Sequence, residues 1–386
     1  ARPLPLAADI LDALDRAIAA GTAGNIAESG RLVGEADASL RGESGLGTLI
    51  DNVALVTGLV SRVDQLDALA AGAELQLESE SGLSTREVER RSNELIALRD
   101  ATWSLRNDRL RTAKAVGELA GKDASASARN AYLSIQQAFS ALDRMEVRGR
   151  DSAGVNVLVW GHDLDATDKR VAPLLAGRLD DALFTNGSVR VGAGNRAWSF
   201  VYKAAAEIGE LGDNTRAMRT TVANDALLRL LVNQPHARVS ILGHTRWASV
   251  GIISEPNAHP VNSEEVGGNS AAPYMLAALN GDVDNHADIK VRNGLKIAEP
   301  ITTDAKVIPT VVARKSAAGM SFVDSFRETV AEFEGSVAIA VASADEPNSM
   351  MLALRGSGQG LYVGIAEDRF IVASEPYGVV EETLHY

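Results

Sequence analysis

Three polar clusters in the second half of the chain adjoin apolar runs, and their residue types suit the binding of small charged groups. Residues 241–250, ILGHTRWASV, place Arg246 directly after such a run; LNGDVDNH at 279–286 ends another, and TTD at 302–304 precedes a helical segment. A guanidinium suits a carboxylate, because its N–H donors match both oxygens, and a carboxylate suits an ammonium group. Fixed donors such as those of an Asn-Gly pair suit a developing oxyanion.

Two further clusters extend this pattern. EVRGRDSAG at 146–154 ends a helix and enters a strand, and EPNAHP at 255–260 is a turn. Each cluster alone is compatible with a loop whose polar groups are satisfied, and Arg246 alone would be interpreted as one side of a surface salt bridge. The functional information therefore lies in the order of the clusters along the chain.

Two glycine-rich stretches do not predict phosphate sites. VGAGN at 191–195 lacks the third glycine and the acidic residue of a dinucleotide site, and RGSGQG at 355–360 lacks the Lys-Ser/Thr continuation of a P-loop. The 6 histidines show no paired spacing of the zinc-enzyme kind. We expect no metal site and no cofactor.

Apolar runs from about residue 150 onwards predict the strands of an α+β domain. They are VNVLVW (155–160), VSILGH (239–244), YMLAALNG (274–281), SVAIAVASA (336–344), SMMLALRG (349–356), LYVGIA (361–366) and RFIVAS (369–374). Several are almost continuously apolar, which is typical of strands covered on both faces. Helical segments lie between them, and hairpin-like spacings among the last four strands indicate antiparallel pairing instead of a doubly wound parallel sheet.

The first 145 residues or so contain helical signals and almost no strand signal. Two apolar stripes recur at helical spacing: Val56, Leu59, Val63, Leu66, Ala70, Ala73 and Leu77, then Val88, Leu95, Leu98, Leu105, Val116 and Leu119. Ser84 and Glu87 form a capping-box pattern at the start of the second helix. Two such helices predict an antiparallel coiled-coil hairpin over residues 52–121 that can bury its own seam.

Composition restricts the possible partners of the protein. The 386 residues carry a formal net charge of -13 and a pI near 5.0, so we expect no binding to nucleic acid or to anionic membranes. No uncharged apolar stretch approaches the roughly 20 residues that span a bilayer, and there is no secretory signal pattern. A cytoplasmic location is therefore expected. The absence of cysteine excludes disulfides, thiolate metal sites and a cysteine nucleophile within these residues.

Taken in order, the clusters resemble the glutaminase domain of the glucosamine-6-phosphate synthases. These are class II glutamine amidotransferases with an N-terminal-nucleophile (Ntn) hydrolase fold, an αββα sandwich. The resemblance covers residues from about 127 to 386, and the His-Thr-Arg-Trp-Ala run at 244–248 is its most specific part. It implies that 1–20 and 122–386 form the Ntn domain and that 21–121 is an inserted antiparallel helical hairpin.

The resemblance also implies roles for individual residues. Arg246 would hold the α-carboxylate of L-glutamine, Asp304 would pair with its α-ammonium, and Asn280 with Gly281 would form the oxyanion hole. The further residues expected to line the substrate pocket are Trp247 at its rim, Ser249, His259 and Arg148. Ser249 and Val250 replace a Thr-His pair of the family, which is expected to alter the rim.

The nucleophile of the family is absent from this sequence. In the family, an N-terminal cysteine opens the first strand and its own α-amino group acts as the base, but this chain begins Ala1-Arg2-Pro3 and contains no cysteine. Three explanations are open: the first strand precedes Ala1, the cysteine was replaced, or the protein no longer hydrolyses glutamine. The first is preferred, because a whole strand is missing and the other end also stops where the family continues.

The sequence therefore predicts a glutaminase domain that supplies ammonia to a C-terminal synthase domain, with a sugar phosphate as acceptor and an amino-sugar phosphate as product. The chain is expected to form a homo-oligomer. The alternative from another functional class is a catalytically inactive module that senses glutamine, or docks a partner through the helical hairpin.

Overall fold

The computed structural model describes residues 6–205, 210–268, 272–383 and 385–386. The chain divides into two compact units, which are described separately. The first contains the chain up to Glu118 together with Gly364–Phe370 and Glu381–His385; the second contains Leu119–Val363 and Ile371–Val380.

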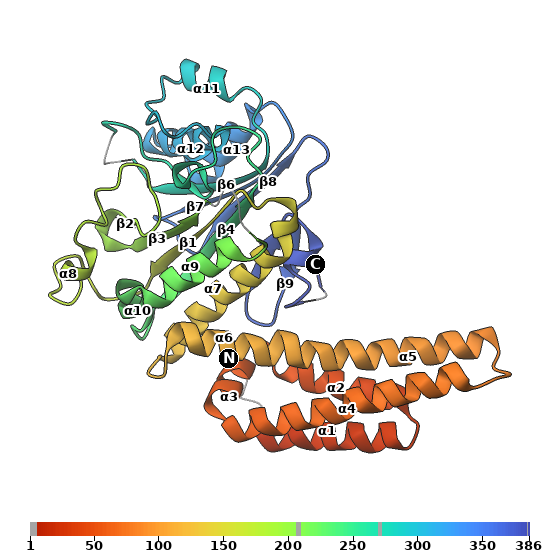
Figure 1. Ribbon diagram of the computed structural model, residues 1–386. Coiled ribbons are helices and arrows are strands. Elements are labelled where there is room, and N and C mark those ends of the chain that lie inside the picture. The colour runs from red at the N-terminus through yellow and green to blue at the C-terminus, as the bar shows by residue number, and fades with distance from the viewer. Residues whose placement is uncertain (1–5, 206–209, 269–271, 384) are drawn as a thin grey trace. The chain divides into compact units, whose positions relative to one another are not determined.

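The first unit is helical (Figure 1). Its helices are α1 (Ala7–Thr22), α2 (Ile26–Ser39), α3 (Gly42–Asp51), α4 (Val53–Ser79), α5 (Thr85–Ser104), a π-helical turn (Leu105–Leu110) and the start of α6 (Arg111–Ala120). Helix α1 contacts α2 and α4, α2 contacts α5, and α4 contacts α5. Among the described residues no single helix is long and apolar enough to cross a membrane, although α3 and α4 pass that test together across a bend of 101°.

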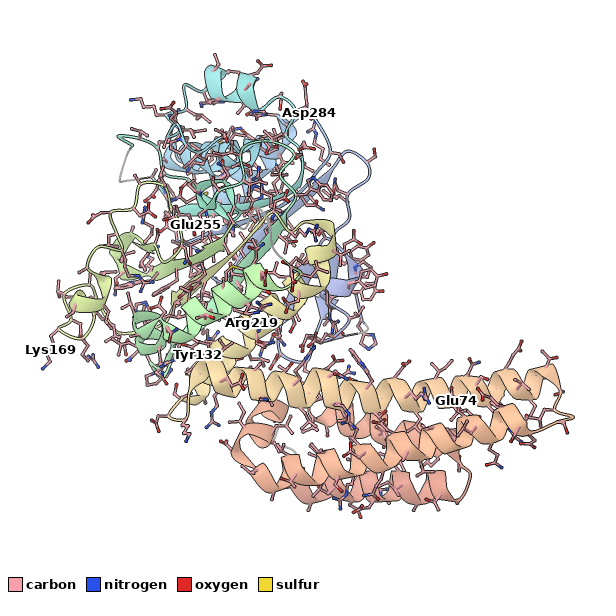
Figure 2. The ribbon with its side chains drawn as sticks, in the orientation of Figure 1. Glu74, Tyr132, Lys169, Arg219, Glu255 and Asp284 are labelled. Carbon is pink, nitrogen blue, oxygen red and sulfur yellow. The ribbon has the colours of Figure 1, made fainter. Side chains whose placement is uncertain are left out.

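Helices α4 and α5 follow the two predicted stripes, but they do not form an isolated hairpin. Leu59 and Leu66 of α4 and Leu98 of α5 are fully buried, and Arg99 of α5 bonds to Glu74 of α4, which is labelled in Figure 2. Helices α1 and α2 cover them as well. Because Leu14 of α1 is buried within this bundle, the described residues 6–20 lie with the helices, whereas the prediction assigned 1–20 to the Ntn domain.

The second unit contains two four-stranded sheets whose neighbouring strands are antiparallel in the described residues. The first has the order β2 (Val189–Val191), β3 (Ala197–Ala204), β1 (Ser152–Trp160), β4 (Arg238–Arg246). The second has the order β5 (Val261–Asn262), β6 (Met275–Gly281), β7 (Val337–Ser343), β8 (Met350–Arg355). Strands β9 (Tyr362–Ile365) and β10 (Phe370–Ala373) pair separately.

The sheets stack face to face and helices cover both outer surfaces (Figure 1). Helices α7 (Ala126–Met145) and α9 (Asp213–Asn224) contact the first sheet, and α12 (Val307–Ala317) and α13 (Phe322–Ala331) contact the second. The shorter helices are α8 (Ala172–Leu175), α10 (Ala226–Val232) and α11 (His286–Arg292). Leu242 of the first sheet and Leu276 of the second belong to one buried cluster between them. This gives four layers in the order helix, sheet, sheet, helix, as the α+β prediction requires.

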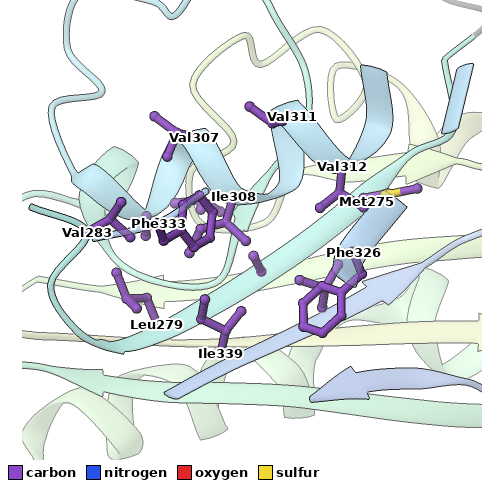
Figure 3. Packing of buried hydrophobic residues seen from close by; sticks show 14 of the residues in the cluster. Met275, Leu279, Val283, Val307, Ile308, Val311, Val312, Phe326, Phe333 and Ile339 are labelled. Carbon is purple, nitrogen blue, oxygen red and sulfur yellow. The ribbon is translucent and has the colours of Figure 1, made fainter. Parts of the chain in front are cut away.

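Strand β6 is buried on both faces because its side chains alternate between two cores. Leu276 and Ala278 face the other sheet, whereas Met275 and Leu279 pack with Ile308 and Val312 of α12 and Phe326 of α13 (Figure 3). The end of this strand is consequently held from both sides, which fixes the backbone at Asn280 and Gly281.

Candidate functional site

Arg246 and the Asn280–Gly281 pair stand at the ends of two strands. Strand β4 ends at Arg246, which pairs in register with Ser152 at the start of β1, and β6 ends at Gly281. Strand β4 contacts β6 across the two sheets. The segments that carry Arg246 and the Asn280–Gly281 pair therefore leave the core together.

Arg246 is buried, with 4% of its surface exposed. Its guanidinium donates to the carbonyl oxygen of Val250 and, at 3.5 Å, to that of Ile252. In the described part of the chain it forms no ion pair with a carboxylate, although Asp304 and Asp151 lie close enough to stabilise its charge. Burial lowers its pKa. A buried cation without a bonded anion is costly, so this position favours an anionic ligand.

The segment after Arg246 is anchored at several points. The Ala248 N–H donates to Asp151 Oδ2 at 2.9 Å, and the Ile252 N–H donates to Thr302 Oγ1 at 3.3 Å. The Ser249 hydroxyl donates to Asp282 Oδ1 at 2.6 Å. Trp247 itself is 72% exposed, and its place at the rim of a pocket remains a prediction.

Gly281 has a conformation that only glycine tolerates. Its φ is 103°, and an added Cβ would lie 1.9 Å from the Ser336 carbonyl oxygen. Asn280 pairs in register with Ala338 and is half-buried, and its side-chain amide makes no hydrogen bond to the other described residues. The strand thus ends in a fixed backbone turn beside a side-chain amide that has no partner among the described residues. Such a pair of hydrogen-bond donors can stabilise an oxyanion.

Asp304 is buried next to this turn, with 4% of its surface exposed. Its Oδ2 accepts the Val283 N–H at 2.8 Å. Burial raises its pKa above the usual 3.8, and the charge of Asp282 acts in the same direction. The preceding segment is held by the fully buried Asn257, whose Oδ1 accepts the N–H groups of Thr302 and Thr303 at 2.7 and 2.9 Å.

His259 lies behind these residues and acts as a structural link. It is 3% exposed; its Nε2 lies 3.1 Å from Thr303 Oγ1, and its Nδ1 accepts the Leu279 N–H at 3.5 Å. Its ring centroid is 4.6 Å from that of His244. Burial lowers the pKa of His259 well below 6.5, with neighbouring cations acting in the same direction, so the ring is neutral near neutral pH. It ties β6 to the segment that carries Asp304.

Arg148 ends a short 3-10 helix at Glu146–Arg148, and its side chain lies outside the described part of the structure. The next residue, Gly149, approaches the end of β4 so closely that an added Cβ would lie 2.7 Å from the Trp247 backbone nitrogen. The chain after Arg148 therefore runs beside the end of β4, and the role of the Arg148 side chain remains a prediction.

Sequence reasoning missed three residues that organise this site: Asp151, Asn257 and Asp282. All three lie inside clusters that the sequence analysis singled out, namely EVRGRDSAG, EPNAHP and LNGDVDNH. Their residue types gave a signal, since short polar side chains next to strand ends commonly bond to backbone groups. Their partners, however, are distant in sequence: Ala248 for Asp151, and Ser249 for Asp282.

Comparisons with known proteins show which proteins the chain is similar to. No family model matches the chain. The chain is 30% identical over 158 residues to a glutamine–fructose-6-phosphate aminotransferase (isomerizing) of Bacillus thuringiensis, covering 41% of this chain and 25% of the relative. The protein of the same name from Neisseria meningitidis is 34% identical over 145 residues, which cover 37% of this chain and 22% of that relative. This similarity relates the chain to the class II glutamine amidotransferase domains.

The chain spans about a quarter of the length of these curated relatives. Among solved structures, a glutamine phosphoribosylpyrophosphate amidotransferase from B. subtilis matches with a TM-score of 0.39 and 19% identity, covering 64% of this chain and 41% of that chain. The structure described as the allosteric regulatory enzyme of purine biosynthesis matches with a TM-score of 0.39 and 18% identity, covering 63% and 40%.

Proposed function

We propose that this domain binds L-glutamine and releases ammonia from its side-chain amide for a synthase domain that forms an amino-sugar phosphate. The observation that carries the proposal is the buried guanidinium of Arg246, which is bonded to no carboxylate of the described residues and lies near the buried carboxylate of Asp304. An α-amino acid carries a carboxylate and an ammonium on one carbon, so it would satisfy both groups at once.

Each residue then has a distinct task. Arg246 binds the α-carboxylate and Asp304 the α-ammonium, which fixes the amino acid by its common end. The side chain of glutamine extends towards the end of β6, where the Asn280 amide and the Gly281 backbone stabilise the oxyanion that forms as the amide is attacked. Ser249 and Trp247 contribute the rim, and His259 supports the segment of Asp304 from behind.

Hydrolysis needs a nucleophile in addition to these groups. In acyl transfer, the nucleophile bonds to the amide carbon, ammonia leaves, and water then releases glutamate. The 386 residues contain no cysteine to take this part, so they account for binding and oxyanion stabilisation only. The sugar-phosphate acceptor is proposed because the relatives are named for an aminotransferase that uses fructose 6-phosphate.

The decisive experiment is labelling of the full natural protein with 6-diazo-5-oxo-norleucine, a glutamine mimic that alkylates the nucleophile. Mass spectrometry should find one adduct per chain, and glutamine should protect against it. If no adduct forms and no ammonia is released, even with an acceptor present, the enzymatic proposal is wrong.

The absence of cysteine from the sequence supports a second candidate function, an inactive glutamine-binding module. Such a module would bind L-glutamine through Arg246 and Asp304 but would give no adduct. Calorimetric binding combined with a negative labelling result would therefore favour the sensor over the enzyme.

A further inference from the structure

Asp282 occupies a special position beside the site. It directly follows Gly281, and its backbone N–H donates to the Ser336 carbonyl oxygen at 3.2 Å, so its backbone is fixed by the end of β7. The side chain is half-buried. A carboxylate at this place adjoins Gly281 and is still partly accessible to a ligand.

One oxygen of Asp282 is bonded and the other is available. Oδ1 accepts the Ser249 hydroxyl at 2.6 Å, which connects the segment after Arg246 to the end of β6. Oδ2 accepts no hydrogen bond from the described residues. Since Ser249 orients the carboxylate, the second oxygen can be presented to a ligand without reordering the side chain.

Asp304 alone leaves a ligand ammonium incompletely satisfied. An ammonium group has three N–H donors, whereas Asp304 Oδ2 already accepts the Val283 N–H and Oδ1 has Thr303 Oγ1 at 3.4 Å. Val283 directly follows Asp282 in the chain, and the charge of Asp282 acts on Asp304, so the two carboxylates are close.

We propose that Asp282 is a second carboxylate that recognises the α-ammonium of the bound amino acid, acting with Asp304, and that it makes the pocket selective for amino acids with a free amino group. This inference rests on the proposed function, because it takes an amino acid as the ligand. The two carboxylates would each accept from the ammonium, while Arg246 holds the carboxylate on the same carbon.

The test compares two ligands that differ only in the amino group. L-Glutamine and 4-carbamoylbutanoate, the same molecule with hydrogen in place of the amino group, are titrated calorimetrically into the chain. The selectivity is the ratio of the two dissociation constants. Asp282→Asn keeps an oxygen for Ser249 but removes the charge, so the selectivity should fall about three- to tenfold, mainly through weaker binding of glutamine.

A purely structural role gives a different result. If Asp282 only anchors the segment after Arg246, Asp282→Asn changes the binding of both ligands equally or leaves both unchanged. An unchanged ratio of the two dissociation constants therefore overturns the proposal. Asp282→Ala should lower the selectivity as well, and it serves if the first variant fails to fold in thermal melting. Asp284→Asn removes a charge from an exposed side chain two residues away, labelled in Figure 2, and should leave the selectivity as in the parent.

Failure of the proposed function would look different again. If the parent binds neither ligand, or if Arg246→Ala binds glutamine as tightly as the parent, the site is not an amino-acid pocket. If the parent and the Arg246 variant behave as proposed and only the Asp282 selectivity is unchanged, the assignment of Asp282 alone is wrong.

Discussion

In the proposed pocket, Arg246 and Asp304 bind the α-carboxylate and the α-ammonium of the amino acid, which are far from the amide that reacts. They should therefore affect the binding of the ligand more than the barrier to amide hydrolysis. We predict that Arg246→Ala lowers the affinity for L-glutamate at least tenfold, or raises KM in the active protein, because a desolvated guanidinium–carboxylate pair is lost. Calorimetry measures the affinity. Arg238→Ala, an exposed arginine at the other end of β4, is the matched control. Unchanged affinity in Arg246→Ala would identify the residue as structural.

Asn280 should act on the barrier. The Asn280 side-chain amide makes no hydrogen bond to the other described residues. An oxyanion forms only when the side-chain amide of glutamine is attacked. We predict that Asn280→Ala lowers kcat by about a hundredfold in the full natural protein, with little change in glutamate affinity. Steady-state ammonia release gives kcat, and calorimetry gives the affinity. A variant that keeps kcat but loses affinity would show that Asn280 binds the ground state instead.

The half-buried His244 and the buried His259 predict a pH dependence of stability. Burial lowers the pKa of His244 to about 4 and that of His259 well below 6.5. Below pH 6.5 the unfolded chain therefore binds protons that the folded chain does not, so stability is lost as the pH falls and is unaffected above this range. The expected slope is at most about 1.4 kcal/mol per pH unit for each histidine. Urea unfolding at several pH values measures it, and His244→Gln should reduce the slope.

At the scale of elements, the predictable part of the fold was the part with a regular apolar pattern. All seven strand runs match observed strands, and Ser84 accepts the Glu87 N–H at 3.3 Å as the capping pattern requires. Strand β3 was missed because Ser199 and Lys203 interrupt its apolar run, yet both are buried. Lys203 lies with its ammonium 5.1 Å from the Phe184 ring centre, a distant contact that no local pattern reveals.

The site followed the same rule. Arg246 ends β4 and Asn280 with Gly281 ends β6, as the apolar runs before them indicated, whereas Asp151 and Asp282 act through partners far along the chain. The boundary at residue 21 could not be predicted, because the apolar face of α1 does not reveal what it packs against. Only the contacts of α1 with α2 and α4 assign it to the helical unit.

A charged cluster inside the helical unit gives an element-scale prediction. Arg109, 4% exposed, donates to Asp37 Oδ1 at 3.0 Å and to the Glu381 carbonyl oxygen at 2.7 Å, and it lies 3.8 Å from Glu382 Oε2. Arg109→Ala removes the buried cation of this cluster; Asp37 keeps its ion pair with Arg41, but Glu382 and the Glu381 carbonyl oxygen lose their contacts with Arg109. The substitution should therefore destabilise the helical unit by about 3 kcal/mol. Thermal melting measures the effect, with the exposed Arg99→Ala as control. Equal melting temperatures for both variants would show that the cluster contributes little.

At the scale of the whole molecule, each unit has its own buried core. Leu59 and Leu98 belong to the helices, and the Leu279 and Phe326 cluster belongs to the sheets. Units with separate cores can unfold in separate transitions. We therefore expect the whole helical unit, and not a hairpin over 52–121 alone, to fold independently, because α1 and α2 complete its core.

The two transitions should respond to different changes. Leu59→Ala removes a fully buried side chain and should lower the stability of the helical unit by about 2–5 kcal/mol, whereas L-glutamine at a hundred times its dissociation constant should stabilise the sheet unit by about 2.7 kcal/mol. Differential scanning calorimetry resolves both effects in one protein. The substitution should move one transition and the ligand the other. A single transition that both of them shift would show that the two cores unfold as one cooperative unit.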